Sequence, residues 1–208
     1  MTIKIEEIKR PLVSRTVLVK LAISAAFLFW VYIIWSSTTD LNRQMKDVSG
    51  QSLAVHNLQV DYKNEVQEWK NVLLRSNNRE SLDRNWKTFE TQHQKVATAS
   101  QDIARQYDVR AISMHIQTFA AAHAENFERY KDSKEVLIKS SFNPQQADTA
   151  VKGIDRPLLE ELESAAVAVQ DETKNIEDRL TAKARSQIEQ SLLILALIAL
   201  LVVWMPKW

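Results

Sequence analysis

A helical repeat of apolar side chains between residues 37 and 76 constrains the fold more than any other feature of the sequence. One column recurs every seven residues, at Leu41, Val48, Val55, Tyr62 and Trp69. A second column, offset from the first by four, contains Met45, Ser52, Gln59, Val66 and Leu73. Two columns at this spacing are typical of a long helix that packs nearly parallel to other helices.

Two further stretches repeat the helical pattern, with steps that alternate between four and three residues. In the first stretch the core-facing positions are Leu82, Trp86, Phe89, His93, Val96, Ser100, Ile103 and Tyr107. In the second they are Ile112, Ile116, Phe119, His123, Asn126, Tyr130, Ser133 and Leu137. Each stretch therefore predicts one packed helix. We expect a turn at Asn77 and Asn78 before the first of these helices, and Asp108 as the N-cap of the second.

The composition agrees with an all-helical fold. Among 208 residues there are two glycines and four prolines, fewer turn formers than a β-rich fold normally needs. The lack of cysteine excludes disulfides, thiolate metal sites and thiol catalysis. A formal net charge of +1 gives no electrostatic reason to expect nucleic acid as a partner. The sequence contains no glycine-rich phosphate loop, nucleophile elbow or H-E-x-x-H motif, so it does not predict an enzyme.

Apolar runs occur at both ends of the chain. Residues 16–35 approach the length of about 20 residues that a transmembrane helix needs, with Lys20 near one edge and aromatic residues near the other. Residues 191–206 form a second predicted span, with Trp208 as an interfacial anchor. The alternatives are a cleaved signal peptide for the first run and a buried soluble helix for the second.

The excess of basic residues before the first run predicts a cytoplasmic N-terminus. The expected organisation is a cytoplasmic segment at 1–15, a transmembrane helix at 16–35, a periplasmic sensor domain at 36–190, a second transmembrane helix at 191–206 and a C-terminal end at 207–208. This organisation corresponds to a multi-pass protein of a bacterial inner membrane.

The region before the second apolar run predicts two more helices. Asn143 and Pro144 are typical of the cap and first residue of a short helix, which Gly153 ends. A fourth long helix is expected from about Arg156, with Asp155 as its cap. The sequence therefore predicts an all-α fold, an antiparallel up-down-up-down four-helix bundle flanked by two transmembrane helices.

Two segments of the predicted bundle carry recurring family sequence: VQEWKNVLLR at residues 66–75 and VKGIDR at residues 151–156. Both are similar to the periplasmic sensor region of bacterial methyl-accepting chemotaxis proteins. The matching residues include Gln67, Glu68, Trp69, Lys70, Asn71, Arg75, Gly153, Asp155 and Arg156. The resemblance implies a ligand-sensing bundle that forms a homodimer through the helix at 37–76. Since no HAMP linker or cytoplasmic signalling region follows, we expect a receptor fragment or a stand-alone sensor that acts through other chemoreceptors.

Two histidines are expected at the same height inside the bundle. His93 and His123 both hold core-facing positions and lie at similar distances from the turn that joins their helices. A pair of this kind can bind a metal ion or haem, but a polar core layer with satisfied hydrogen bonds is the favoured interpretation. No cofactor is therefore predicted.

Basic residues gather at the turns that form the far end of the bundle. The candidate ligand-binding residues are Lys70, Arg75, Arg79, Arg84, Lys152 and Arg156. Pooled guanidinium and ammonium groups suit a small anion such as a carboxylate. The alternative is a solvated surface at the helix ends, where Glu80, Asp83 and Asp155 neutralise the charge.

The predicted function is that of a membrane-anchored, ligand-sensing module of a chemotaxis receptor. A small ligand would shift the helices, and the last helix would relay the shift through the second span. The alternative is a non-sensing bundle that pairs with full-length receptors and modulates them.

Overall fold

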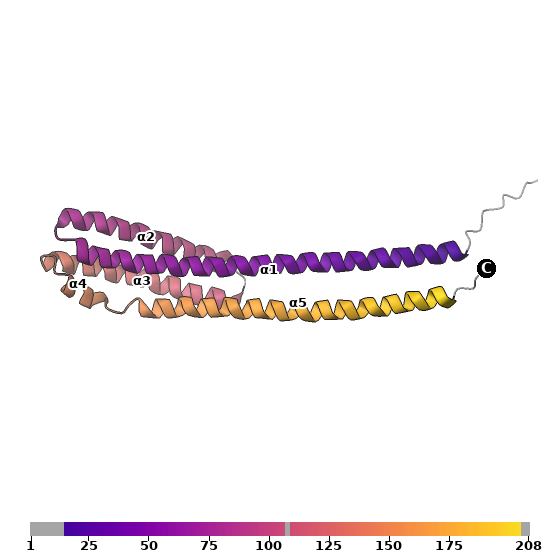
Figure 1. Cartoon of the computed structure of the whole chain (residues 1–208). Helices are drawn as coiled ribbons and strands as arrows, with labels where there is room; N and C mark the ends of the chain where they lie inside the picture. Colours follow the sequence, from indigo (N-terminus) through magenta and orange to yellow (C-terminus); the bar gives the residue numbers. More distant parts are fainter. Residues whose placement is uncertain (1–14, 107–108, 205–208) are drawn as a thin grey trace, which may run out of the picture. The chain divides into compact units, whose positions relative to one another are not determined.

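The protein is helical throughout the part that the structure describes. The computed structural model describes residues 15–106 and 109–204, without the side chains of residues 15, 16, 18, 19, 22 and 201–204. The helices in these ranges are α1 (Arg15–Arg75), α2 (Arg79–Gln106), α3 (Arg110–Lys139), α4 (Pro144–Val151) and α5 (Arg156–Trp204) (Figure 1). No strand occurs among these residues, which confirms the all-α prediction.

The chain divides into two compact units, and α1 and α5 each contribute to both. The first unit contains the residues up to Arg43 and those from Asp178 onward, and the second contains Gln44–Glu177. The second unit is the helical bundle. Gln59 Nε2 of α1 donates to the Leu162 carbonyl of α5, and Gln92 Nε2 of α2 donates to the Asp61 carbonyl of α1, at 3.1 and 2.8 Å.

The two predicted transmembrane helices are wrong. In the part of the chain described, no helix has both the length and the apolar character needed to cross a bilayer. A span needs about 20 consecutive, predominantly apolar residues. The periplasmic placement of the bundle and the orientation of the termini depended on these spans and lose their support.

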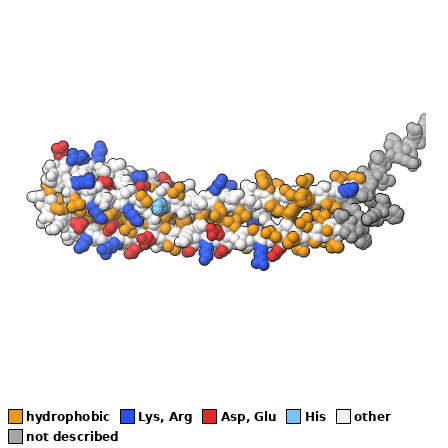
Figure 2. Space-filling view, viewed as in Figure 1, with side chains coloured by type: hydrophobic (Ala, Val, Ile, Leu, Met, Phe, Trp, Pro, Cys, Tyr) orange, Lys and Arg blue, Asp and Glu red, His pale blue; other side chains and the backbone are white. Residues whose placement is uncertain are grey.

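The first unit nevertheless exposes many large apolar side chains. They lie on both of its helical segments and include Leu28, Phe29, Trp35, Leu193, Leu197 and Leu200. Figure 2 shows hydrophobic side chains gathered over this part of the chain. Apolar patches of this extent mark surfaces that meet another apolar surface.

The turns of the bundle form where the sequence predicts them. Asn78 Oδ1 accepts a hydrogen bond from the Ser81 amide at 2.8 Å and so caps α2. Asn143 Oδ1 accepts from the Gln145 and Gln146 amides at 3.0 and 3.4 Å and caps α4. Gly153 follows α4 with a φ of 80°, in the left-handed region that favours glycine. The predicted cap Asp108 and the core position Tyr107 lie outside the described residues.

The core of the bundle follows the predicted positions closely in α2 and α3. Every predicted core residue of α2 from Leu82 to Ile103, and all eight predicted for α3, are buried. In α1 the first column is also buried from Val48 to Trp69. The second column is wrong for most of its length: Ser52 is exposed, Met45, Gln59 and Val66 are only half-buried, and Leu73 alone is buried. The buried side chains that continue along the helix lie three residues after the first column instead of four. They are Gln51, Leu58, Glu65 and Val72.

Aromatic side chains fill the core where the end of α1, the start of α2 and the end of α3 meet. The Phe89 ring is fully buried and lies 5.7 Å from the ring of Trp69, 5.2 Å from that of Trp86 and 5.1 Å from that of Tyr130, between ring centroids. Because these rings come from α1, α2 and α3, they join three helices in one packed layer.

Candidate functional site

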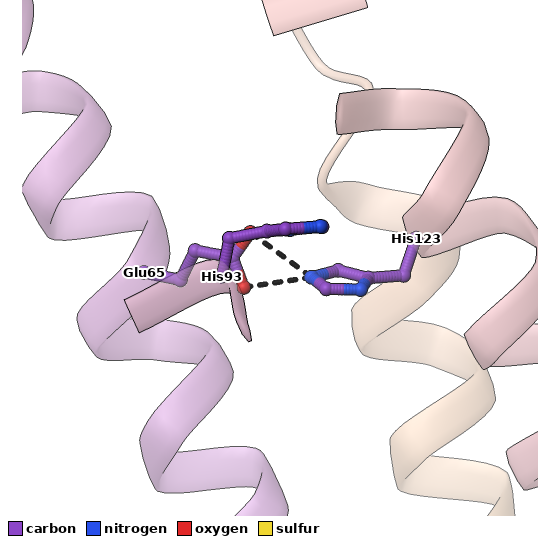
Figure 3. A group of neighbouring side chains, drawn as sticks. All are labelled: Glu65, His93 and His123. Carbon is purple, nitrogen blue, oxygen red and sulfur yellow. Dashed lines mark hydrogen bonds and ion pairs between the residues drawn. The ribbon is translucent and has the colours of Figure 1, made fainter. Parts of the chain in front are cut away.

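A carboxylate and two imidazoles meet in the interior of the bundle. Glu65 lies on α1, His93 on α2 and His123 on α3, and their side chains point toward one another (Figure 3). Glu65 Oε1 lies 2.9 Å from His93 Nδ1 and 2.9 Å from His123 Nε2, and Glu65 Oε2 lies 2.7 Å from His123 Nε2. The three residues are 2%, 9% and 2% exposed, so the cluster is shielded from solvent.

Apolar and aromatic rings surround this cluster. The His93 ring stacks on Phe127 at 3.8 Å with an interplanar angle of 5°, and on His123 at 4.2 Å with an angle of 23°. Phe119 and Tyr62 lie 5.4 and 5.9 Å from the His123 ring. The stacking fixes both imidazoles in the core, and it places their ring nitrogens beside the carboxylate.

The electrostatics of the cluster favour an ionised Glu65. Burial alone would raise the pKa of the Glu65 carboxyl, but the hydrogen bonds from His123 and His93 outweigh burial and lower the pKa below its ordinary value. Both imidazole nitrogens that face the carboxylate therefore act as N–H donors. A buried carboxylate without such donors would be strongly unfavourable.

Two phenols in the core titrate abnormally. Burial, together with neighbouring acidic groups that include Glu65 and Asp155, raises the pKa of both Tyr62 and Tyr130. The Tyr62 hydroxyl is buried and has no hydrogen-bond partner. The core beside the cluster thus contains one buried hydroxyl without a hydrogen-bond partner among the described residues.

The sequence predicted part of this site. The two histidines were expected at the same height, and the structure brings their ring centroids to 4.2 Å. Glu65 was missed, because the second column of α1 was placed four residues after the first. The signal that identifies it is the column three residues after the first, in which Glu65 follows Leu58 and precedes Val72.

The predicted basic residues at the bundle's far end all lie exposed, at the helix ends or along two grooves. Arg84 lines a groove between α1 and α2 with Asn64, Gln67 and Thr88, among others. Lys70 lines a different groove with Leu74, Pro144 and Asp148. Arg79 pairs with Asp83 at 3.5 Å, and Lys152 is the C-cap of α4. Arg75 ends α1 and Arg156 begins α5, so a shared anion site at these residues stays a prediction.

The residues of the family sequence serve the fold in several places. Trp69 is buried in the aromatic core, while Asn71 Nδ2 donates to Glu68 Oε2 at 3.1 Å along the same helix. The Asp155 carbonyl accepts from the Leu159 amide at 3.1 Å in the first turn of α5. The segment at 66–75 therefore holds the core together and adds polar side chains to the grooves on either side.

The fold and the cluster define an all-helical bundle with a buried polar layer of one carboxylate and two imidazoles. Over 152 residues the chain is 25% identical to the methyl-accepting chemotaxis protein CtpH of Pseudomonas aeruginosa. The match covers 72% of this chain and 26% of that protein, so the chain spans about a quarter of its relative. No protein-family model matches the chain, and no solved structure matches it. The similarity supports a distant relationship to a chemoreceptor.

Proposed function

We propose that this chain is a sensory module in chemotaxis signalling. The observation that carries the proposal is the similarity to a methyl-accepting chemotaxis protein across most of the chain. The resemblance of residues 66–75 and 151–156 to receptor sensor sequences agrees with it. A receptor role of this kind is non-enzymatic, since it depends on binding and on a shift between two packed arrangements of the helices.

The helices offer a direct route for such a shift. A ligand that binds the bundle stabilises the arrangement that it fits better. α5 is one helix from Arg156 to Trp204, without a break where the first unit begins. A small displacement of its first turns therefore moves the whole helix, because an intact helix is a rigid element. The ligand in this proposal is a small anion bound by the basic side chains predicted for this role, among them Arg75 and Arg156.

The experiment combines binding with behaviour. Purified full-length chain is screened by thermal shift against a panel of organic and inorganic anions, since a ligand that binds the folded state raises the melting temperature. We expect a stabilising compound to elicit chemotaxis in the native host, with the response lost on gene deletion and restored by the wild-type chain. Arg75→Ala and Arg156→Ala should weaken both the shift and the response. Unchanged chemotaxis to every stabilising compound after deletion would contradict the proposal.

A homodimer through α1 forms part of this proposal. Leu53, Val60 and Leu74 are exposed on α1, at 61%, 43% and 77%. Their spacings of seven and fourteen residues place them on one face of the helix, away from the buried columns. The same column contains Gln67 between Val60 and Leu74, so the stripe is apolar at three of four positions. An exposed face of this kind with a seven-residue period is typical of a helix that pairs with a second copy of itself.

Val60→Glu is expected to weaken this dimer by at least about tenfold in dissociation constant, because it buries an unpaired carboxylate in the stripe. Light scattering of the full chain over a concentration series measures the effect. Met114→Glu, on the exposed face of α3, is the matched control and should leave the dimer intact. If the chain is monomeric and Val60→Glu instead abolishes binding to a purified chemoreceptor, the stripe serves a non-sensing bundle that modulates receptors.

A further inference from the structure

We propose that Glu65, His93 and His123 bind one divalent transition-metal cation of the Zn²⁺ type. This site goes beyond the sensory function proposed above and does not depend on it. Two imidazole nitrogens and a carboxylate are a donor set that Zn²⁺ uses in proteins. Here the donors come from three different helices, so a bound cation would join α1, α2 and α3 at one point.

The donor atoms already converge. His93 Nδ1, His123 Nε2 and a carboxylate oxygen of Glu65 lie within 4.8 Å of one another. Metal bonds of about 2.1 Å at tetrahedral angles separate neighbouring donors by about 3.4 Å. The N–O distances of 2.7 and 2.9 Å at His123 must therefore open by about 0.5–0.7 Å to reach that separation. Because both oxygens of Glu65 face the same imidazole, the carboxylate can bind the metal ion through both oxygens, as a bidentate ligand. Together with the two imidazole nitrogens this gives a four-coordinate site.

The charge and burial of the cluster favour a cation. With neutral imidazoles, the cluster carries the single negative charge of Glu65 in a layer formed by Tyr62, Phe119 and Phe127. A divalent cation replaces the two N–H hydrogen bonds by direct bonds to the carboxylate and to both nitrogens, whose protons move to the other ring nitrogen or to solvent, and the apolar surroundings strengthen these bonds.

Metal binding changes the orientation of at least one imidazole. A metal ion lies in the plane of each imidazole that binds it, through the ring nitrogen's lone pair. The two rings are stacked at 4.2 Å with an angle of 23°, so one point near both nitrogens cannot lie in both planes. One ring must turn and loosen the stack, and this rearrangement acts directly between α2 and α3. The metal-free and metal-bound bundles therefore differ in packing at their centre.

The test uses the full chain on a tag without histidine, stripped of metal with a chelator and titrated with ZnCl₂ by calorimetry. We expect one tight site per chain. Glu65→Gln and His123→Gln should each lower the affinity for Zn²⁺ by more than about 100-fold. Losing a residue that only orients a metal ligand typically lowers the affinity by about 10- to 100-fold. His115→Gln is the matched control, since His115 pairs with Glu161 at 2.8 Å on the half-buried α3–α5 surface, and no third metal-binding side chain joins them among the described residues. It should leave the tight site unchanged.

A second measurement keeps the proposal testable if circular dichroism shows that a variant of the cluster does not fold. Stoichiometric Co²⁺ in the wild-type chain should give the intense visible bands of a four-coordinate ion, and Zn²⁺ should displace them. The proposal is overturned if the folded wild-type chain shows no tight site, if Co²⁺ shows only six-coordinate absorption, or if the site survives Glu65→Gln and disappears in His115→Gln. None of these readouts involves chemotaxis, so failure here leaves the sensory function standing.

Discussion

Replacing Phe89 by alanine is expected to destabilise the bundle by about 3–5 kcal/mol. The side chain is fully buried and contacts rings from three helices, with Trp69 on α1, Trp86 on its own helix and Tyr130 on α3 at 5.1–5.7 Å. Its removal deletes a large apolar surface and leaves a cavity. The surrounding rings are held by other contacts and cannot collapse fully into that space, which places the loss toward the upper end of the range.

Urea unfolding of the full chain, followed by circular dichroism, measures this loss as a change in midpoint at constant slope. Met114→Ala on the exposed face of α3 is the control, since a 56% exposed side chain should change stability by no more than about 0.5 kcal/mol. A loss below about 1 kcal/mol for Phe89→Ala, comparable with that control, would show that the aromatic rings are not packed as described.

Two helices could be predicted almost residue by residue, and the reason is their period. In α2 and α3 the steps of four and three residues admit only one buried face, so Leu82, Phe89, Ile116 and Leu137 could each be assigned to the core. The caps Asn78 and Asn143 were also predictable, because an asparagine just before a helix satisfies amide groups that the helix leaves free.

The sequence is ambiguous where polar residues are buried. In α1 the column containing Val66 and Leu73 looks more apolar than the column containing Gln51 and Glu65, yet the second is buried at every position from Gln51 to Val72, whereas only Leu73 of the first is buried. A pattern that ranks positions by hydrophobicity cannot recognise a glutamate that is buried because His93 and His123 satisfy it. The partners come from distant parts of the chain, and the cluster becomes visible only when three helices are placed side by side.

The apolar ends show a different limit. Apolar runs with flanking basic and aromatic residues predicted two transmembrane helices, but the described residues contain no helix that meets the length and apolar character of a span. The basic residues at the far end of the bundle show a third limit. Their positions near the predicted turns placed them in one group, while the structure assigns Arg84 and Lys70 to different grooves. Local sequence reveals which residues share a helix face more readily than which faces meet.

Replacing Glu65 by alanine is expected to destabilise the metal-free bundle by about 3–5 kcal/mol, because it breaks a buried charged group of hydrogen bonds. Two imidazole N–H groups lose their acceptor in a core from which water is excluded, and each buried donor left unpaired costs about 1–3 kcal/mol. Glu65→Gln is the informative partner variant, since its amide oxygen can still accept one hydrogen bond while the charge is lost. We expect its loss to be clearly smaller, and equal losses for the two variants would contradict an acceptor role for Glu65.

The pH dependence of the Glu65→Gln difference separates charge from packing. Hydrogen bonds from His123 and His93 lower the pKa of folded Glu65 below the ordinary value of 4.5, so the unfolded chain takes up this proton first as the solution is acidified. The stabilisation due to the carboxylate is therefore complete above about pH 5 and is lost as the pH falls through the lowered folded pKa. Urea midpoints of the wild type and Glu65→Gln, measured with chelator present, should differ most near neutrality and approach each other in acid. A constant difference from neutral to acidic pH would show that Glu65 stabilises the core through its shape and not through its charge.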